Sequence, residues 1–210
     1  APVGEVAFCG HATIALGAAL GAQEGAGRFE LNLRDANISV EAMQDGDTWL
    51  AALQSPETWS KPLQDELCLE LLTLFGITNT DLDPELTPRL AFAGVRHAVI
   101  TLKDRATLAQ MDYPFDDMRA LMLQHNLVTV SLLHHTAPRC FEARNAFASG
   151  GVIEDPATGD AAAALGGALV DMDWDGLRSG GTFNIIQGAD MGMPSALTVE
   201  VTGVPGASVR

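Results

Sequence analysis

Two residues able to transfer protons, His11 and Asp160, stand at equivalent positions of a segment that occurs twice in the chain. Residues 10–20 read GHATIALGAAL and residues 159–169 read GDAAAALGGAL, and seven of the eleven aligned positions are identical. In each copy the residue follows a leading glycine. A histidine exchanges protons near neutral pH, and a carboxylate serves as a general base, so the pair predicts acid–base chemistry.

The leading glycines, Gly10 and Gly159, predict two places where an anion can bind. Both copies are runs of small apolar residues that favour helix. The first N–H groups of a helix lack partners within it, and glycine lets a ligand approach them closely. Two such helix starts facing each other would hold a small carboxylate between them. The alternative is that Asp160 only caps its helix and that His11 is a satisfied helix-start residue.

A second concentration of charge precedes the later copy, where residues 154–158 read EDPAT. Pro156 disfavours helix at Asp155, which places the two carboxylates on a turn leading into the helix. Asp155 is therefore a further candidate for the site. The alternative role for these acids is to stabilise the helix dipole.

The repeated helices predict the architecture. Each is apolar on every face, and a helix without a polar side is expected to be buried. We therefore expect an α+β fold of two pseudo-symmetric domains, each a β-barrel or roll around a central buried helix. Residues 78–88 contain Pro84 and Pro88 and are predicted to link a domain at residues 1–88 to one at residues 89–210.

Hydrophobic patterning supplies the other elements. Strands are expected at residues 5–8, 28–34, 37–43, 98–102, 127–133, 140–148, 182–187 and 196–202. Helices are expected at residues 64–75, 105–111 and 116–125. Because the first repeat begins only about ten residues into the chain, the strands that should precede its helix are missing. We expect part of the natural protein to lie outside these 210 residues.

Composition excludes several classes of partner. The net charge of −15 argues against nucleic acid and anionic membranes, and no apolar run is long enough to span a bilayer. Three cysteines without paired spacing predict a reduced, cytoplasmic protein. Neither a phosphate-binding nor a dinucleotide-binding glycine motif occurs, and no metal-ligand set has usable spacing. We expect no cofactor and no metal.

Three motifs, in order along the chain, resemble the phenazine-biosynthesis PhzF-like proteins, which share the diaminopimelate-epimerase fold. Residues 8–13 (FCGHAT) resemble the family's F-[AC]-G-H-[PA]-T. Residues 144–147 (RNAF) and 151–159 (GVIEDPATG) resemble R-x-F…G-x-x-E-D-P-A-T-G, and residues 187–195 (QGADMGMPS) resemble Q-G-x-x-M-G-R-P-S. The chain departs from the pattern at Asp160, where a serine is common, and at Met193, where an arginine is expected.

The resemblance implies a cofactor-independent isomerase that moves a proton on a small carboxylate-bearing metabolite bound between the domains, and it implies a homodimer. By position, His11 and Asp155 match residues that the family uses at its site. Asp160 departs from the family pattern, and we expect it to be an auxiliary acid or base. Gly10 and Gly159 would hold the substrate carboxylate, with Thr158 beside them. The family's catalytic glutamate precedes the first motif, in a segment that these residues do not reach.

Two further residues are candidates for substrate contact. His97 precedes a strand at the position where related folds place a substrate-contacting residue. Cys9 sits where related racemases carry a catalytic thiol, although the matching position in the second half is Thr158. Two alternatives to the isomerase therefore stay open, which are a cysteine-assisted racemase or epimerase of the same fold and a non-catalytic binding or scaffold protein.

Overall fold

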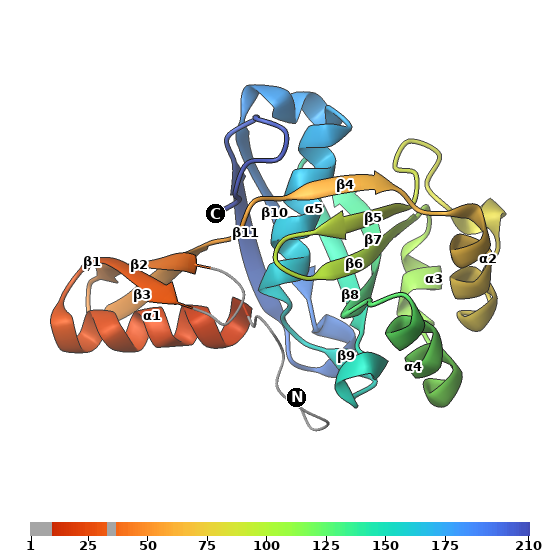
Figure 1. Cartoon of the computed structure of the whole chain (residues 1–210), viewed down its shortest axis with the longest axis horizontal. Helices are drawn as coiled ribbons and strands as arrows, with labels where there is room; N and C mark the ends of the chain where they lie inside the picture. Colours follow the sequence, from red (N-terminus) through yellow and green to blue (C-terminus); the bar gives the residue numbers. More distant parts are fainter. Residues whose placement is uncertain (1–9, 33–36) are drawn as a thin grey trace.

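The computed structural model describes residues 10–32 and 37–210, which form a small lobe and a large lobe (Figure 1). The small lobe contains α1 (Gly10–Glu24), β1 (Gly27–Asn32), β2 (Asn37–Asp45) and β3 (Thr48–Gln54). The large lobe contains the strands β4 (Trp59–Pro62), β5 (Arg89–Phe92), β6 (Arg96–Leu102), β7 (Thr129–Ala137), β8 (Cys140–Ala146), β9 (Glu154–Asp155), β10 (Gly181–Gln187) and β11 (Ser195–Val201). Its helices are α2 (Asp65–Leu74), α3 (Arg105–Ala109), α4 (Phe115–Gln124) and α5 (Gly159–Asp171), and short 3₁₀ turns occur at η1 (Asn79–Asp81), η2 (Ala148–Gly150), η3 (Trp174–Ser179) and η4 (Ala189–Met191).

In the small lobe, α1 lies along one face of an antiparallel sheet with the order β1-β2-β3. A two-residue turn at Gly46 and Asp47 joins β2 to β3, and Gly46 has the positive φ of 59° that such tight turns favour. The helix approaches the sheet through glycines. A Cβ added to Gly17 would lie 2.2 Å from Val40 Cγ2, so this close packing requires glycine.

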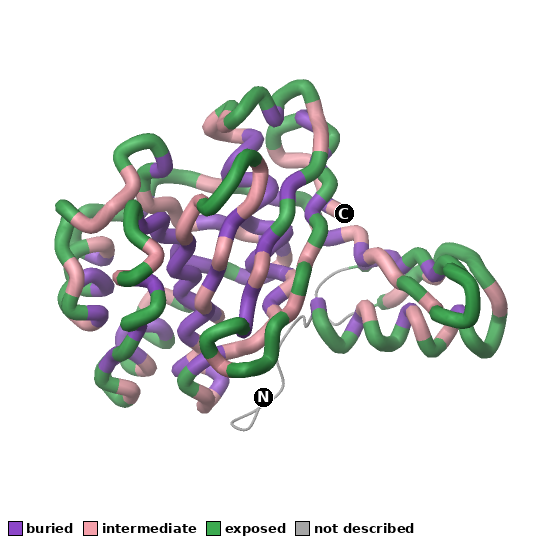
Figure 2. Tube along the Cα trace, turned by 180° about the vertical axis from the view of Figure 1, so that it is seen from behind, coloured by how far each residue is buried: buried purple, intermediate pink, exposed green. Residues whose placement is uncertain are grey.

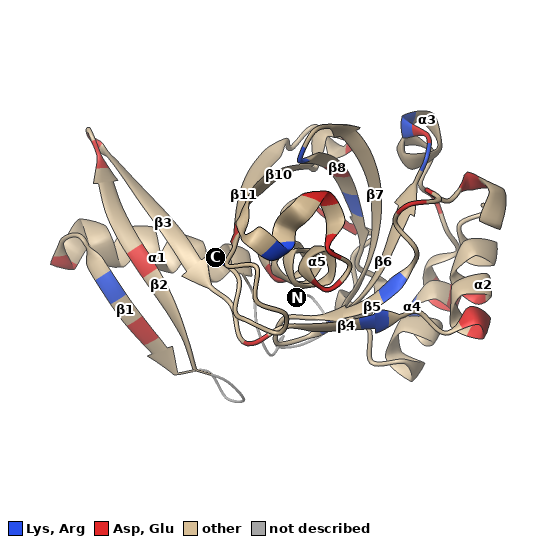
Figure 3. Ribbon diagram, turned by 90° about the horizontal axis from the view of Figure 1, so that it is seen from above, with Lys and Arg blue, Asp and Glu red and all other residues tan. Residues whose placement is uncertain are grey.

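In the large lobe, an eight-stranded sheet curls around α5, as the end-on view in Figure 3 shows. Its strand order is β11-β10-β8-β7-β6-β5-β4, with β9 paired to β8. The parallel pair β6 and β7 is connected through α3 and α4. Alternate residues of β6 to β8 face α5, and the others face an outer layer that includes α2 and α4.

Helix α5 is buried along nearly its whole length, from Asp160 to Val170. Two glycines allow this. A Cβ on Gly166 would lie 3.1 Å from side chains of Val199 and Val209, and one on Gly167 would lie 2.4 Å from Thr58 Oγ1. Gly166 aligns with Gly17 in the repeat, and each faces a valine of its own sheet. The two copies therefore pack against their sheets in the same way.

The expectation of burial on every face is confirmed for α5 and wrong for α1. The buried residues of α1 are Gly10, Thr13, Gly17 and Gly21, which form one stripe. The opposite face of the helix is largely exposed (Figure 2). It carries small apolar residues and Leu16, and the relative exposure of Leu16 is 45%. The described small-lobe sheet covers only one side of α1, whereas the sheet of the large lobe curls around α5.

Most predicted elements are present within a few residues of their expected bounds, whereas β3, β4, β5 and the two-residue β9 were not predicted. The strands β4 and β5 have four residues each, too few for alternation to be recognised. The chain passes from the sheet of the small lobe to that of the large lobe between β3 and β4, because β4 pairs with β5. This crossing comes earlier in the sequence than the predicted boundary at residue 88.

The expected strand at residues 5–8 lies outside the described residues. None of the described helices is long and apolar enough to cross a membrane.

The glycine-mediated packing of α1 generates a test. We expect Gly17→Ala to lower the free energy of unfolding by about 1–3 kcal/mol because the new methyl group overlaps Val40. Helix propensity alone would predict a gain of about 1 kcal/mol. Gly27→Ala is the control, since a Cβ there meets nothing within 4 Å. Urea denaturation measures both variants, and a more stable Gly17→Ala protein would contradict the packing described.

Candidate functional site

The amino ends of α1 and α5 meet backbone to backbone. A Cβ on Gly10 would lie 2.9 Å from Gly159 Cα and 3.0 Å from the Asp160 nitrogen. A Cβ on Gly159 would lie 3.3 Å from Gly10 Cα. The predicted convergence of the two helix starts is confirmed. The expected gap that would hold a carboxylate between them is wrong, because the contact leaves no room even for a side chain at Gly10.

Asp155 is fixed beside this junction by hydrogen bonds from two neighbouring residues. The Thr158 hydroxyl donates to Asp155 Oδ2 at 2.6 Å. Gln187 Nε2 donates to the Asp155 carbonyl at 2.6 Å and to Thr158 Oγ1 at 2.9 Å, while Gln187 Oε1 accepts from the Thr158 N–H at 3.1 Å. The hydroxyl of Thr158, which precedes α5, therefore orients Asp155 and does not cap the helix.

The local sequence explains why Asp155 lies here. Pro156 keeps Asp155 extended, and the extended segment pairs with β8 as the two-residue strand β9. Burial raises the pKa of the Asp155 carboxyl, whereas the hydrogen bond from Thr158 and the charge of His11 lower it. His11, on α1, is therefore close enough to act on Asp155 electrostatically although the two residues belong to different lobes. The His11 side chain is exposed.

Asp160 lies inside the structure, with a relative exposure of 4%. Its Oδ1 accepts a hydrogen bond of 2.9 Å from the Ala161 N–H, so it satisfies one amide of its own helix start. Burial raises the pKa of Asp160 to about 7, and the nearby Asp155 charge contributes in the same direction. A carboxyl that changes its charge near neutral pH is suited to acid–base chemistry.

Polar side chains from the curled sheet surround the start of α5, and we call this group the polar collar. Strand pairing places His97 beside Thr129, Ser131 beside Asn145, and Asn145 beside Asp155. His135 lies at the end of β7 opposite to Thr129, and its ring packs on Trp174, which follows the carboxyl end of α5. Thr129 therefore lies near the amino end of α5. The collar consists of five buried residues on four strands: His97, Thr129, Ser131, Asn145 and Gln187.

The collar holds polar atoms without protein partners. Among the described residues, His97 Nε2, Ser131 Oγ and Asn145 Oδ1 are buried without a hydrogen bond. His97 Nδ1 lies 2.8 Å from Thr129 Oγ1, and burial lowers the pKa of His97 to about 3, so its ring is neutral. Buried polar groups without partners are rare, which marks the collar as an unusual environment.

The structure thus brings most of the predicted site residues together. His11, Asp155, Thr158 and Asp160 lie around the contact of Gly10 with Gly159, and His97 lies in the buried wall around α5. Cys9 lies outside the described residues. Gln187 and Asn145 were not predicted as site residues, although both stand inside the quoted motifs. Each looks like an ordinary polar residue of a strand until pairing places it beside Asp155.

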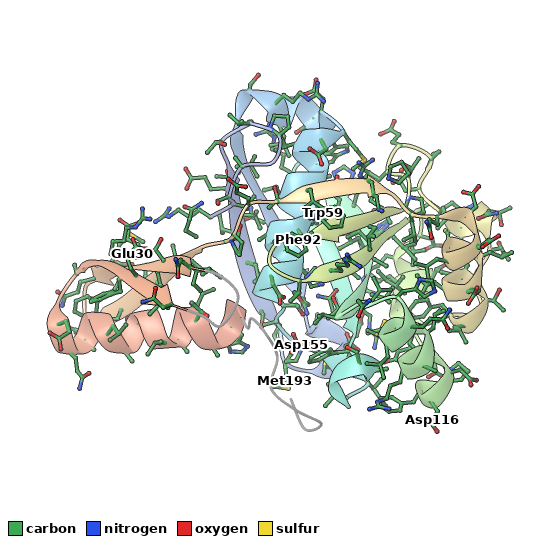
Figure 4. All side chains as sticks on the ribbon, in the orientation of Figure 1. Glu30, Trp59, Phe92, Asp116, Asp155 and Met193 are labelled. Carbon is green, nitrogen blue, oxygen red and sulfur yellow. The ribbon has the colours of Figure 1, made fainter. Side chains whose placement is uncertain are left out.

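Ion pairs support the loop between β10 and β11. Arg105 bonds both carboxylate oxygens of Asp190 at 2.9 Å and also bonds Glu142. Arg144 pairs with Glu154, with its closest contact at 2.5 Å. Met193, in the same loop, is exposed and lies at the same end of the molecule as Asp155 (Figure 4). The arginines of this region therefore bind protein carboxylates, and the position where the family motif has arginine is neutral.

An apolar groove of about 590 Å³ runs between the lobes from the start of α5 toward the carboxyl-terminal residue. Its lining includes Ala15 and Leu50 from the small lobe and Gly159, Leu197 and Arg210 from the large lobe and the carboxyl terminus. No metal-binding group of three His, Cys, Asp or Glu side chains occurs within residues 10–32 and 37–210. The described groups at the junction are backbone amides, the carboxyl groups of Asp155 and Asp160, the Thr158 hydroxyl and the His11 imidazole.

Comparisons with known proteins agree with this arrangement. The family model described as phenazine biosynthesis-like protein matches residues 1–209. A trans-2,3-dihydro-3-hydroxyanthranilate isomerase from Pseudomonas chlororaphis is 30% identical over 206 residues, covering 96% of this chain and 68% of that protein.

Two solved structures share the fold. A predicted epimerase from Pseudomonas aeruginosa has a TM-score of 0.80 at 24% identity, covering 98% of this chain and 70% of its own. A PhzF-family phenazine biosynthesis protein from Bacillus anthracis has a TM-score of 0.79 at 17% identity, covering 98% of this chain and 72% of its own.

The buried Asp160 carboxyl makes stability depend on pH. Its folded pKa of about 7 exceeds the ordinary value of 3.8, so its stabilising contribution is complete below about pH 4 and is lost as the pH rises through 7. We expect Asp160→Asn to match the original protein below about pH 4 and to exceed its unfolding free energy by up to about 4 kcal/mol near pH 8. Urea denaturation at several pH values measures this, with Asp116→Asn on α4 as a control. If the free energy of unfolding changed with pH in the same way for Asp160→Asn and the original protein, the raised pKa assigned to Asp160 would be wrong.

Proposed function

We propose a reaction for this chain on the premise that it belongs to the phenazine biosynthesis-like (PhzC-PhzF) family, whose model matches residues 1–209. The chain is an isomerase of this family. The proposed reaction is a cofactor-independent proton transfer on a small carboxylate-bearing metabolite that binds beside the contact of the two helix starts. The observation that carries the proposal is this contact, with Asp155 fixed beside it in one lobe and His11, from the other lobe, close enough to lower the pKa of Asp155.

Binding of the carboxylate rests on the backbone amides at Gly10 and Gly159. A helix start has N–H groups without partners inside the helix, and the positive ends of both dipoles lie at one place here, which favours a negative group. The glycines keep this surface open to a ligand on the sides where the helices do not touch. The groove, whose lining includes Gly159, provides apolar space for the body of the metabolite.

Proton transfer rests on Asp155 and His11. The raised pKa of Asp155 makes its ionised carboxylate a stronger base, and the hydrogen bond from Thr158 fixes the direction in which it points. In the proposed reaction Asp155 removes a proton next to an activated carbon, and His11 returns a proton at another position. Asp160 serves as an auxiliary acid or base. His97 and Cys9 are proposed as further substrate contacts, and a homodimer and a cytoplasmic location remain predictions.

Deuterium incorporation tests the reaction. We expect the protein in deuterated water to exchange a carbon-bound hydrogen of a small carboxylate substrate, detected by mass spectrometry across a panel of metabolites. His11→Asn and Asp155→Asn should each slow exchange by about 100-fold or more, because each removes a group that transfers the proton. Asp116→Asn, far from the site in Figure 4, is the matched control. Binding of carboxylates without any exchange would reject the reaction in favour of a binding protein.

Substitution of Cys9 separates this reaction from a cysteine-assisted racemase. The position equivalent to Cys9 in the second half is Thr158, whose hydroxyl donates to Asp155. We therefore expect Cys9→Ser to retain exchange within about threefold, since no second thiol completes a two-cysteine mechanism. A loss comparable to that of Asp155→Asn would instead assign the proton transfer to the thiol.

A further inference from the structure

A row of alternating charges lies on the outer face of the large-lobe sheet. Glu142 and Arg144 both belong to β8, and Phe141 and Ala143, which alternate with them, pack against α5. Side chains alternate between the two faces of a strand, so Glu142 and Arg144 project away from α5. Ion pairs extend this row to α3, η4 and β9. We call it the charge row, and its members in order are Glu142, Arg105, Asp190, Arg144 and Glu154.

The charge row ends on the strand that carries Asp155. The two residues of β9 are Glu154, which stands opposite Ala146 of β8, and Asp155, which stands opposite Asn145. Residues opposite each other in an antiparallel pair project to the same face of the sheet. Ala146 packs in the outer core, and Asn145 faces α5, so the two carboxyl groups of β9 point to opposite faces. A partner that holds Glu154 therefore also sets the direction in which Asp155 points.

Arg144 is the partner that holds Glu154. Its Nε donates to Glu154 Oε1 at 3.1 Å, and its Nη2 donates to Glu154 Oε2 at 2.5 Å, so the pair is two-pronged. Its Nη1 donates to the Ala109 carbonyl at the end of α3, at 2.9 Å. The two charged side chains are 13% and 4% exposed, so water screens the pair much less than a surface pair. A lysine has a single nitrogen and cannot supply this fork.

Arg144 also faces the loop that contacts Asp155 from the β10 side. Asp190 in η4 accepts hydrogen bonds of 2.9 Å from Arg105 at both carboxylate oxygens, and Arg144 Nε lies 3.9 Å from Asp190 Oδ2. Gln187, three residues before Asp190, donates to the Asp155 carbonyl at 2.6 Å. Arg144 therefore lies between the two segments that determine where Asp155 is placed.

We propose that Arg144 is a positioning residue for the reaction, and that through Glu154 and the η4 loop it fixes the direction of the Asp155 side chain. This inference rests on the proposed function, in which Asp155 removes the substrate proton. The ion pairs of Arg144 among the described residues are with Glu154 and Asp190, so it acts through them and not on the base itself. A misplacement of about 1 Å in a reacting group slows a reaction by up to about 100-fold.

Arg144→Lys tests the inference, because lysine keeps the positive charge and removes the fork. We expect kcat for the deuterium exchange to fall about tenfold or more while KM stays within about threefold. Arg139→Lys is the matched control. Arg139 pairs with Asp175 on the surface before β8, and exposed ion pairs contribute little, so kcat should stay within about twofold. Glu154→Gln keeps an oxygen acceptor for Arg144 and should reduce kcat less than Arg144→Lys does.

The pKa of Asp155 is a second readout, which a general loss of stability would not move. The hydrogen bond from Thr158 lowers this pKa, so a displaced Asp155 loses part of that effect and its pKa should rise in Arg144→Lys. Charges from α1 and α5 also act on Asp155, namely those of His11 and Asp160. Within residues 10–32 and 37–210 neither of them forms an ion pair with the charge row, so the substitution leaves both in place.

Titration of the aspartate carboxyl carbons by NMR measures the pKa of Asp155 without turnover, and Asp155→Asn identifies its signal. Thermal denaturation first confirms that each variant is folded. If Arg144→Lys does not fold, Glu154→Gln decides the question, since it weakens the same pair and should shift kcat and the pKa in the same directions by less. Arg139→Lys should leave the pKa unchanged.

The outcomes separate the two claims. An unchanged pKa of Asp155 in folded Arg144→Lys, or equal effects of Arg144→Lys and Arg139→Lys on kcat, would overturn this inference and leave the proposed function standing. If the original protein exchanges no hydrogen with any substrate of the panel, the proposed function fails. The NMR titration then still decides whether Arg144 holds Asp155 in place.

Discussion

The close contact between Gly10 and Gly159 is the constraint on which the rest of the structure depends. Each helix start carries a partial positive charge of roughly half an elementary charge, and two of them in backbone contact repel each other. Nearby negative charge offsets that repulsion. Asp155 and Asp160 supply it from the protein, and a bound carboxylate would add to it. When both are ionised, these two carboxyl groups exceed the combined partial charge of about +1 at the two helix starts, so an anion would bind there more readily when Asp160 is protonated.

This constraint also explains the use of glycine in both repeats. A side chain at Gly10 would overlap the backbone of α5, and side chains at Gly17 and Gly166 would overlap valines of the two sheets. The glycines of the duplicated sequence thus allow two close approaches. One is between the two helix starts, and the other is between each helix and its own sheet. The surroundings of the helices differ nevertheless. The sheet of the large lobe curls around α5, whereas the described strands of the small lobe cover α1 on one side.

Sequence reasoning succeeded where the signal is local. The repeat, the helix starts and the strands with clear alternation are all encoded within about ten neighbouring residues, and the structure contains them. The four-residue strands β4 and β5 are too short for such a signal, and their pairing is fixed by contacts such as the stacking of Trp59 on Phe92, with ring centroids 5.3 Å apart (Figure 4). The polar collar could not be predicted because its residues are far apart in the sequence. His97, Ser131, Asn145 and Gln187 belong to four strands, and only the pairing register brings them to one end of α5.

The position of Asp160 shows how such a site balances stability against chemistry. A carboxyl at 4% exposure in a helix that is otherwise small and apolar destabilises the fold once it ionises, by up to about 4 kcal/mol for the shift to a pKa of about 7. Marginally stable proteins have little stability to spare at positions where an uncharged residue fits equally well. The cost of burying the ionised carboxyl therefore makes the stability of the large lobe depend on pH at the very position where its central helix begins.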